Sequence, residues 1–154
     1  ESGKPAITRN ASNALGFDVN ANITSTTEFS VFALYEAQGD NRPFSFNGAG
    51  IYAGSNSGNP RMYQGTFIQT ATTYTQPAIH SYLFASPDKC YMNGVERLSG
   101  DAGSNAITQI SVLGGTTATF RQALYMQEVV YYASDQSSNR TNIESNINTF
   151  YSIY

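Results

Sequence analysis

The chain has 154 residues and a mass of 16.7 kDa, which is the size of a single domain. Its 8 Lys and Arg and 11 Asp and Glu give a formal net charge of −3, which argues against a nucleic-acid-binding domain with a basic face. One cysteine and one histidine exclude an internal disulfide, a multi-cysteine zinc site and a multi-histidine metal centre. No apolar run approaches the ~18 residues of a membrane span, so no membrane insertion is expected.

Short apolar stretches recur along the chain, and Gly, Pro, Asn, Asp and Ser separate them. This pattern is typical of an all-β sandwich or barrel. The expected strands cover residues 6–8, 14–19, 28–37, 42–46, 50–53, 61–72, 78–85, 90–95, 108–113 and 122–132.

Several of these segments have a more specific pattern. Residues 29–35 and 124–132 are apolar on both faces, which predicts central strands covered on both sides. Residues 54–60 are polar and Gly-rich and predict a long loop, whereas Asn93 and Gly94 predict a tight hairpin. The ribbon of residues 62–74 is rich in Thr, Gln and aromatic residues and predicts a strand with one solvated face.

The C-terminus has helical periodicity. Ile143, Ile147, Phe150 and Tyr151 fall at i, i+4, i+7 and i+8, which places them on one stripe of a helix. We expect an amphipathic helix over residues 138–150, with Ser137 as its N-terminal cap, packed on the sandwich.

The order of several motifs resembles that of a known family. These motifs are Gly-Lys-Pro-Ala-Ile at 3–7, Ala-Leu-Gly-Phe at 14–17, the strand at 29–35, Tyr-Met-Asn-Gly at 91–94, Ile-Ser-Val-Leu-Gly-Gly at 110–115 and Gln-Glu-Val-Val-Tyr-Tyr at 127–132. In this order they resemble the concanavalin A-like, laminin-G-like jelly-roll domains of phage tail fibres and bacterial surface proteins.

The resemblance implies an all-β fold, an antiparallel β-sandwich of the jelly-roll type with one short C-terminal α-helix. It implies one domain over residues 1–154, as the C-terminal part of a longer protein. Many family members have further N-terminal strands before the Gly-Lys-Pro motif, and this sequence begins close to that motif. We expect either a trimmed version of the domain or the loss of those strands with a preceding segment.

Acid–base catalysis by a glycanase of this fold needs two carboxyl groups ~5–9 Å apart. No expected strand carries two carboxylates at i, i+2 spacing, Asp88, Glu96 and Asp101 fall on turns, and Glu128 stands alone in an apolar strand. The alternative is a catalytic pair whose two carboxylates come from different strands. The favoured prediction is that the protein is not an enzyme.

The single histidine and the single cysteine also have plain structural interpretations. His80 shares a strand face with Ala78, Tyr82 and Phe84, which favours a structural or ligand-stacking role. Cys90 is expected to be a small buried apolar group.

The resemblance makes calcium a candidate cofactor, because laminin-G-like domains often hold one calcium ion at a sandwich edge. The oxygen ligands available are Asp40 with Asn41, and Asp101 with Asn105. The favoured alternative is that these residues form turns, so no cofactor is predicted and calcium stays open.

Carbohydrate binding suits the supply of neutral polar and aromatic side chains, because amides and guanidinium groups bond sugar hydroxyls and aromatic rings stack on sugar C–H faces. The alternative for each tyrosine is a plain strand-forming role. The candidate ligand-binding residues are Tyr52, Asn56, Asn59, Arg61, Tyr63, Gln64 and Tyr74, with a second group of Asp40, Asn41 and Arg42.

The leading functional hypothesis is a non-catalytic binding module of a phage fibre, virion or bacterial surface protein that recognises a cell-surface glycan. Its place is then extracellular or on the virion surface. One alternative is a structural virion decoration or assembly module, in which the aromatic residues 150–154 dock on a neighbouring subunit or a second copy. Another is a carbohydrate-binding appendage of a polysaccharide-degrading enzyme.

Overall fold

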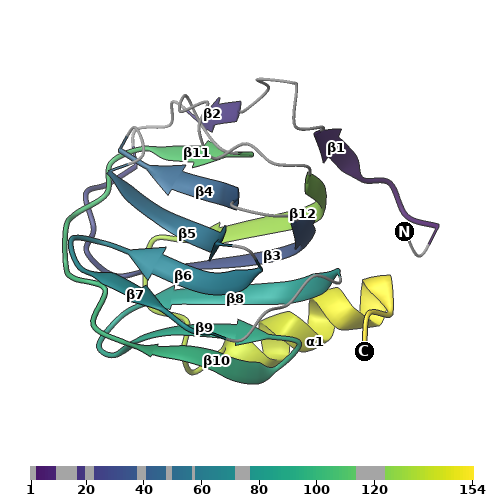
Figure 1. Cartoon of the computed structure of the whole chain (residues 1–154). Coiled ribbons are helices and arrows are strands. Elements are labelled where there is room, and N and C mark those ends of the chain that lie inside the picture. Colours follow the sequence, from purple (N-terminus) through teal and green to yellow (C-terminus); the bar gives the residue numbers. More distant parts are fainter. Residues whose placement is uncertain are drawn as a thin grey trace.

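The computed structural model shows two antiparallel sheets packed face to face, with one helix on the outer face of one of them (Figure 1). The predicted β-sandwich with a short C-terminal helix is therefore confirmed. The structure describes residues 3–9, 17–19, 23–37, 41–47, 50–56, 58–71, 77–113 and 124–154.

Each sheet has six strands in the described part of the chain. Sheet A contains, in spatial order, β1 (Ile7–Arg9), β12 (Leu124–Tyr132), β3 (Phe29–Ala37), β8 (Ala78–Phe84), β9 (Asp88–Met92) and β10 (Val95–Gly100). Sheet B contains, in spatial order, β2 (Phe17–Val19), β11 (Ile110–Val112), β4 (Asn41–Phe46), β5 (Ile51–Asn56), β6 (Asn59–Tyr63) and β7 (Phe67–Gln69).

The centre of sheet A is buried on both faces. All seven residues of β8 are buried, and the described side chains of β3 are buried up to Tyr35. Phe29 and Phe84 stack in the space between the sheets, whereas Phe32 and Leu83 face the helix on the other side. The apolar character of residues 29–35 on both faces therefore predicted a central strand correctly, because β3 lies between β12 and β8.

Two predictions about loops and strands in sheet B are wrong. Residues 54–60 are not a long loop, because β5 continues to Asn56 and pairs with β6 down to Asn59. Residues 61–72 are not one strand, because the chain turns at residues 64–66, where Gly65 has a φ of 122°, and returns as β7. In the first place the polar residues Ser55, Asn56 and Asn59 occupy strand positions, which a reading of polarity alone assigns to a loop. In the second place a single glycine marks the turn, so the composition of the segment does not reveal it.

The predicted hairpin at Asn93 and Gly94 is confirmed. Their φ angles are 47° and 77°, so both residues adopt the left-handed conformation that a two-residue turn of this kind requires. The turn joins β9 to β10, a strand that the sequence pattern did not predict.

Helix α1 (Arg140–Tyr151) agrees with the predicted helix within two residues. Ile147 and Tyr151 are buried against sheet A as expected, but Phe150 is 58% exposed and lies off the buried stripe. Ser137 is not the cap, because its hydroxyl donates to Asp135 and the helix is preceded by Asn139, whose side chain makes no capping bond.

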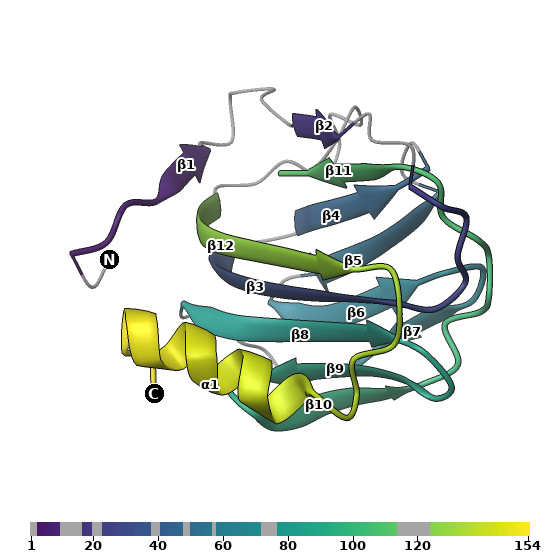
Figure 2. The same cartoon turned by 180° about the vertical axis from the view of Figure 1, so that it is seen from behind.

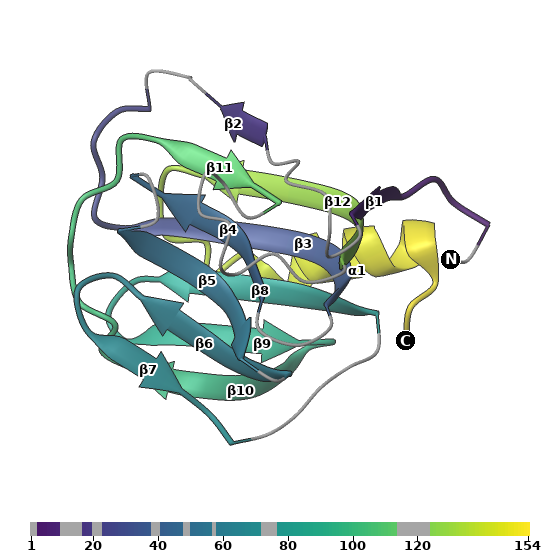
Figure 3. The ribbon, with the colours of Figure 1, turned by 45° about the horizontal axis from the view of Figure 1, so that its top comes forward.

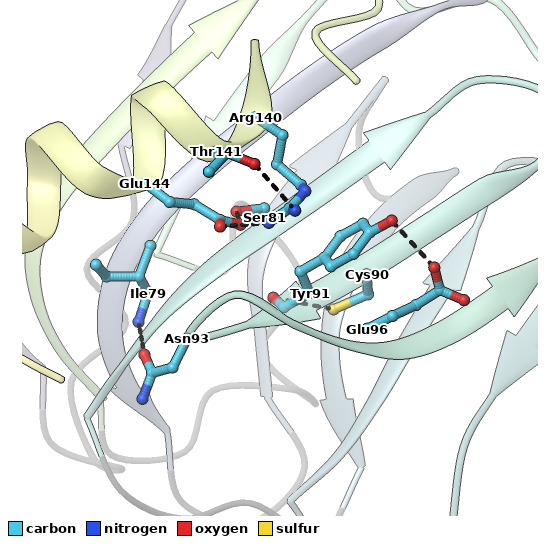
Figure 4. Close-up of polar contacts among 9 residues, drawn as sticks. All are labelled: Ile79, Ser81, Cys90, Tyr91, Asn93, Glu96, Arg140, Thr141 and Glu144. Atoms are coloured by element: carbon cyan, nitrogen blue, oxygen red, sulfur yellow. Dashed lines mark hydrogen bonds and ion pairs between the residues drawn. The ribbon is translucent and has the colours of Figure 1, made fainter. Parts of the chain in front are cut away.

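A buried carboxylate anchors α1 on sheet A (Figure 4). Glu144 is 2% exposed and accepts a hydrogen bond of 2.6 Å from the Ser81 hydroxyl of β8. Its other oxygen pairs with Arg140, one helical turn earlier. The Arg140 guanidinium in turn lies 4.0 Å from the ring centroid of Tyr91 in β9. Because a buried carboxylate is stable only when paired and hydrogen-bonded, these contacts fix where the helix lies.

The residues after α1 fold back on the helix. The Asn148 side chain accepts hydrogen bonds from the backbone N–H groups of Ile153 and Tyr154 and donates one to the Tyr154 carbonyl. The C-terminal aromatic segment is thus held by its own domain through these bonds, with Tyr154 remaining 55% exposed.

His80 lies in the core, where its ring stacks on Tyr35 with centroids 3.8 Å apart. The Tyr35 and Tyr82 hydroxyls share a hydrogen bond of 2.6 Å beside it. Burial lowers the pKa of His80 to about 3, so the ring is neutral at neutral pH. Cys90 is buried as expected, and burial raises the pKa of its thiol.

Replacing the anchoring carboxylate should destabilise the domain. Glu144→Ala leaves Ser81 and Arg140 without their buried partner, so we expect the free energy of unfolding to fall by about 2–4 kcal/mol. Urea unfolding followed by circular dichroism measures this change. The neighbouring exposed position gives the control, because Ser145→Ala should change stability by less than about 0.5 kcal/mol. Equal stability of the two variants would contradict the anchoring role.

The single histidine should make the domain acid-sensitive. The pKa of His80 is about 3 in the folded state and about 6.5 when unfolded, so the unfolded chain binds the proton first as pH falls. Stability should therefore drop from pH 6.5 towards pH 3, by up to about 1.4 kcal/mol per pH unit. We expect wild type to lose about 3 kcal/mol more than His80→Phe between pH 7.5 and 4.5 in urea unfolding. Identical pH profiles would exclude His80 as the cause.

Candidate functional site

Three aromatic side chains form a row across the outer face of sheet B. Strand register places Tyr52 of β5 opposite Tyr63 of β6, and Tyr63 opposite Phe67 of β7. Opposed residues of an antiparallel pair project from the same face, and the intervening Ala53 and Met62 point into the core. Tyr52, Tyr63 and Phe67, here called the aromatic row, therefore lie on the outer face, where β5, β6 and β7 run side by side (Figure 3).

The aromatic row becomes more accessible towards the edge of the sheet. Tyr52 is 7% exposed, Tyr63 is half-buried and Phe67, on the edge strand β7, is 49% exposed. The Tyr52 and Tyr63 rings stack with centroids 5.6 Å apart and planes 18° from parallel. A ligand on this face thus meets Phe67 and Tyr63 first, on rings whose positions are fixed by strand pairing.

Two arginines flank the row. The Arg42 guanidinium lies 3.8 Å from the centroid of the Tyr52 ring, and that of Arg61 lies 5.3 Å from the same centroid. These are cation–π distances, and they hold two positive groups beside the aromatic rings. Arg61 and Gln69 are opposed across β6 and β7, so a guanidinium and an exposed amide lie next to Tyr63 and Phe67.

The structure brings together four of the residues that the sequence analysis proposed: Arg42, Tyr52, Arg61 and Tyr63. Asn59 lies at the far end of β6, paired with Asn56 in the backbone register. Asn41 begins β4, and only the backbone of Asn41 and Asn56 is described. Asp40 and Tyr74 lie outside the described residues.

Gln64 belongs to a turn rather than to the aromatic row. Its side chain is 1% exposed, and its amide nitrogen donates to the Thr27 and Asn105 carbonyls at 2.7 and 2.9 Å. The neighbouring loop approaches so closely that a Cβ on Gly103, whose φ is 97°, would lie 2.6 Å from the Gln64 carbonyl oxygen. The Gln64 amide is therefore used to hold the turn between β6 and β7.

Phe67 completes the aromatic row and Gln69 lies beside it, but the sequence analysis did not name either as a site residue. It placed both on one long strand with Tyr63, on which Phe67 would lie four residues along the strand rather than directly opposite Tyr63. The signal that was available is Gly65, which permits the turn that places Phe67 opposite Tyr63.

A polar hollow of about 400 Å³ lies among loops at one end of the sandwich, lined in part by Glu28, Asp88, Asp101 and Ser104. Both Asp88 oxygens accept backbone N–H groups, from Ala85 at 3.0 Å and from Ala102 at 2.6 Å. Burial raises the pKa of Asp88. These bonds make Asp88 a structural residue that joins two loops.

Of the two pairs of candidate calcium ligands, the structure describes the side chains of Asp101 and Asn105. Asp101 accepts the Gly103 N–H at 2.9 Å, as a turn-forming aspartate does. In the part of the chain that the structure describes, no three His, Cys, Asp or Glu side chains lie close enough together to hold a metal ion. Asp40 of the other pair lies outside these residues.

No protein-family model matches the sequence, and the search of curated proteins gave no significant match. Solved structures do match. The binding domain of Paraclostridial Mosquitocidal Protein 1 aligns with a TM-score of 0.67 at 14% identity, over 94% of this chain and 43% of that chain. A heptameric SAP-like pentraxin from Limulus polyphemus aligns with a TM-score of 0.65 at 8% identity, over 91% of this chain and 81% of that chain.

A third structure comes from botulinum neurotoxin type C, whose cell entry depends on interaction with two ganglioside molecules. It aligns with a TM-score of 0.52 at 15% identity, over 79% of this chain and 36% of that chain. The chain thus spans less than half the length of the two toxin chains that it matches. At these identities the three likenesses establish the fold, a β-sandwich that is shared by proteins with little sequence in common.

Removing the Gln64 amide should cost stability. Gln64→Ala breaks two buried hydrogen bonds to backbone carbonyls, so we expect the free energy of unfolding to fall by about 1–3 kcal/mol. Gln69→Ala removes the same side chain from an exposed position on the next strand and should change stability by less than about 0.5 kcal/mol. Thermal and urea unfolding compare the two variants. If Gln64→Ala is as stable as Gln69→Ala, Gln64 has no structural role.

Proposed function

We propose that this protein is a non-catalytic module that binds cell-surface carbohydrate, with the aromatic row as its binding site. The observation that carries the proposal is the row itself, in which strand register aligns Tyr52, Tyr63 and Phe67 and leaves the outer rings accessible. Flat rings fixed on a rigid sheet suit the C–H faces of sugars. The exposed Gln69 amide, beside Phe67 on β7, supplies N–H donors and a carbonyl acceptor for sugar hydroxyls.

The kinds of protein that share this fold support a binding role. One structural neighbour is the binding domain of a mosquitocidal protein, and another comes from a neurotoxin whose cell entry depends on ganglioside molecules. These properties belong to those proteins. The two likenesses support our proposal because this chain has the same sandwich fold and carries the aromatic row on the outer face of sheet B.

The residues around the row do not suit hydrolysis. Glycoside hydrolysis uses a pair of carboxyl groups, whereas the charged groups described beside the row are the guanidinium groups of Arg42 and Arg61. Elsewhere Glu96 pairs with Lys89 at 3.0 Å, and Glu144 is bonded to Ser81 and Arg140. We therefore assign recognition without a reaction.

We further propose that the module acts outside the cell, on a phage fibre, a virion or a bacterial surface protein, as one part of a longer protein. The support for this finer assignment is the motif order that resembles those families, together with the sugar-compatible outer face of sheet B. No helix of the described residues is long and apolar enough to cross a membrane.

Truncating the accessible rings should weaken glycan recognition. A panel of defined neutral and sialylated oligosaccharides should show saturable binding by wild type, and Tyr63→Ala and Phe67→Ala should each weaken it at least about 10-fold. Tyr125→Ala removes a partly exposed ring from the other sheet and should bind as wild type does. Melting temperatures verify that each variant is folded. The absence of binding by folded wild type, or unchanged binding by both row variants, would refute the proposal.

A further inference from the structure

Helix α1 lies on the outer face of sheet A, on the side of the domain away from sheet B (Figure 2). A second hollow is lined by residues of α1 and by Glu128 of β12. Its volume is about 750 Å³, within the range of small-molecule binding sites. We call it the helix groove, and its polar and aromatic wall consists of Glu128 of β12 and of Asn142, Ser145, Asn146, Thr149 and Phe150 of α1.

The groove exists because α1 is docked off-centre. The Ser81 hydroxyl of β8 donates a hydrogen bond to Glu144, and the Tyr91 ring of β9 makes a cation–π contact with Arg140. These contacts place the helix over the β8 and β9 side of sheet A. It reaches β12 near its C-terminal end, where the Tyr151 hydroxyl oxygen lies 3.1 Å from the carbonyl oxygen of Gln127. The outer face of β12 is consequently left partly open beside the helix, and a smaller hollow continues along it to Tyr132.

One wall of the groove carries an oriented carboxylate. The Tyr151 hydroxyl donates to Glu128 Oε2 at 2.9 Å, and burial raises the pKa of this tyrosine to about 12, so the donor keeps its proton. The second Glu128 oxygen makes no hydrogen bond to any residue that the structure describes. Glu128 is therefore held in place with an acceptor still available for a ligand.

The other wall carries two unused amides. Asn142 and Asn146 are four residues apart, so they project from the same face of the helix, and both line the hollow. Neither side chain forms a hydrogen bond within the described residues, whereas the Asn139 and Asn148 amides at the helix ends are bonded. Asn in a helix interior costs up to about 0.7 kcal/mol relative to Ala, and no bond offsets that cost here.

We propose that the helix groove binds a neutral oligosaccharide. The Asn142 and Asn146 amides each offer a donor and an acceptor to sugar hydroxyls, and Glu128 accepts from hydroxyls on the opposite wall. Phe150, 58% exposed, closes one end, with the Lys4 ammonium 4.2 Å from its ring centroid. Glu128 is the charged residue among those that line the hollow, and its carboxylate repels an acidic sugar placed beside it, whereas the Lys4 ammonium lies at the Phe150 end.

This inference extends the proposed function to a second site on the other face, and either site can fail alone. The test uses ¹⁵N-labelled full-length chain and NMR titration with lactose, cellobiose and chitobiose as neutral probes and N-acetylneuraminic acid as the acidic probe. We expect a neutral sugar, but not the acidic one, to shift the resonances of residues 127–132 and 141–150.

The double variant Asn142→Ala/Asn146→Ala should weaken this binding at least about 10-fold while leaving the fold intact, because Ala is the better helix former. The Tyr63→Ala/Phe67→Ala double variant is the matched control on the opposite face and should keep the groove shifts. No groove shift with any neutral sugar at tens of millimolar, or shifts unchanged by the Asn142→Ala/Asn146→Ala variant, would overturn the inference. Groove shifts that persist when no ligand binds the aromatic row would support it independently of the proposed function.

Discussion

The burial of β3 and β8 on both faces is the constraint on which the rest of the domain depends. Their inward residues meet sheet B, and their outward residues need a cover of their own, which α1 supplies with Ile147 and Tyr151. Large apolar side chains contribute about 1.5–3 kcal/mol each when buried, so neither cover is dispensable. The two candidate sites lie outside these covers, on the outer faces of sheet B and of β12.

Apolar contacts hold helix α1 against sheet A, whereas the hydrogen bond between Ser81 and Glu144 determines its position on that sheet. Hydrophobic contact is non-directional, and a helix resting on Phe32 and Leu83 has several positions of similar burial. The hydrogen bond between Ser81 and Glu144 has one geometry. It selects the position over β8, and the unfilled space beside β12 follows from that choice.

The sequence was sufficient for the fold class because its signals are local or periodic. Apolar residues on both faces of the segment 29–35 predicted β3, and the helical spacing of Ile143, Ile147 and Tyr151 predicted α1. The Asn93-Gly94 pair predicted a hairpin. The site was predicted only in part. Tyr63 and Phe67 become neighbours through a turn that polarity did not reveal, and Glu144 meets Ser81 across 63 residues of chain. Strand register and helix docking are properties of tertiary packing, which a single sequence does not encode in any local pattern.

The off-centre position of α1 also has a consequence for how the domain presents itself to its surroundings. The outer faces of sheet A and sheet B point away from each other, with two sheets about 10 Å apart between them. A flat surface can touch only one of these faces at a time. If both proposed sites bind ligand, they add no avidity on a single surface, but they allow one small domain to bridge two surfaces, or to cross-link soluble chains into a network.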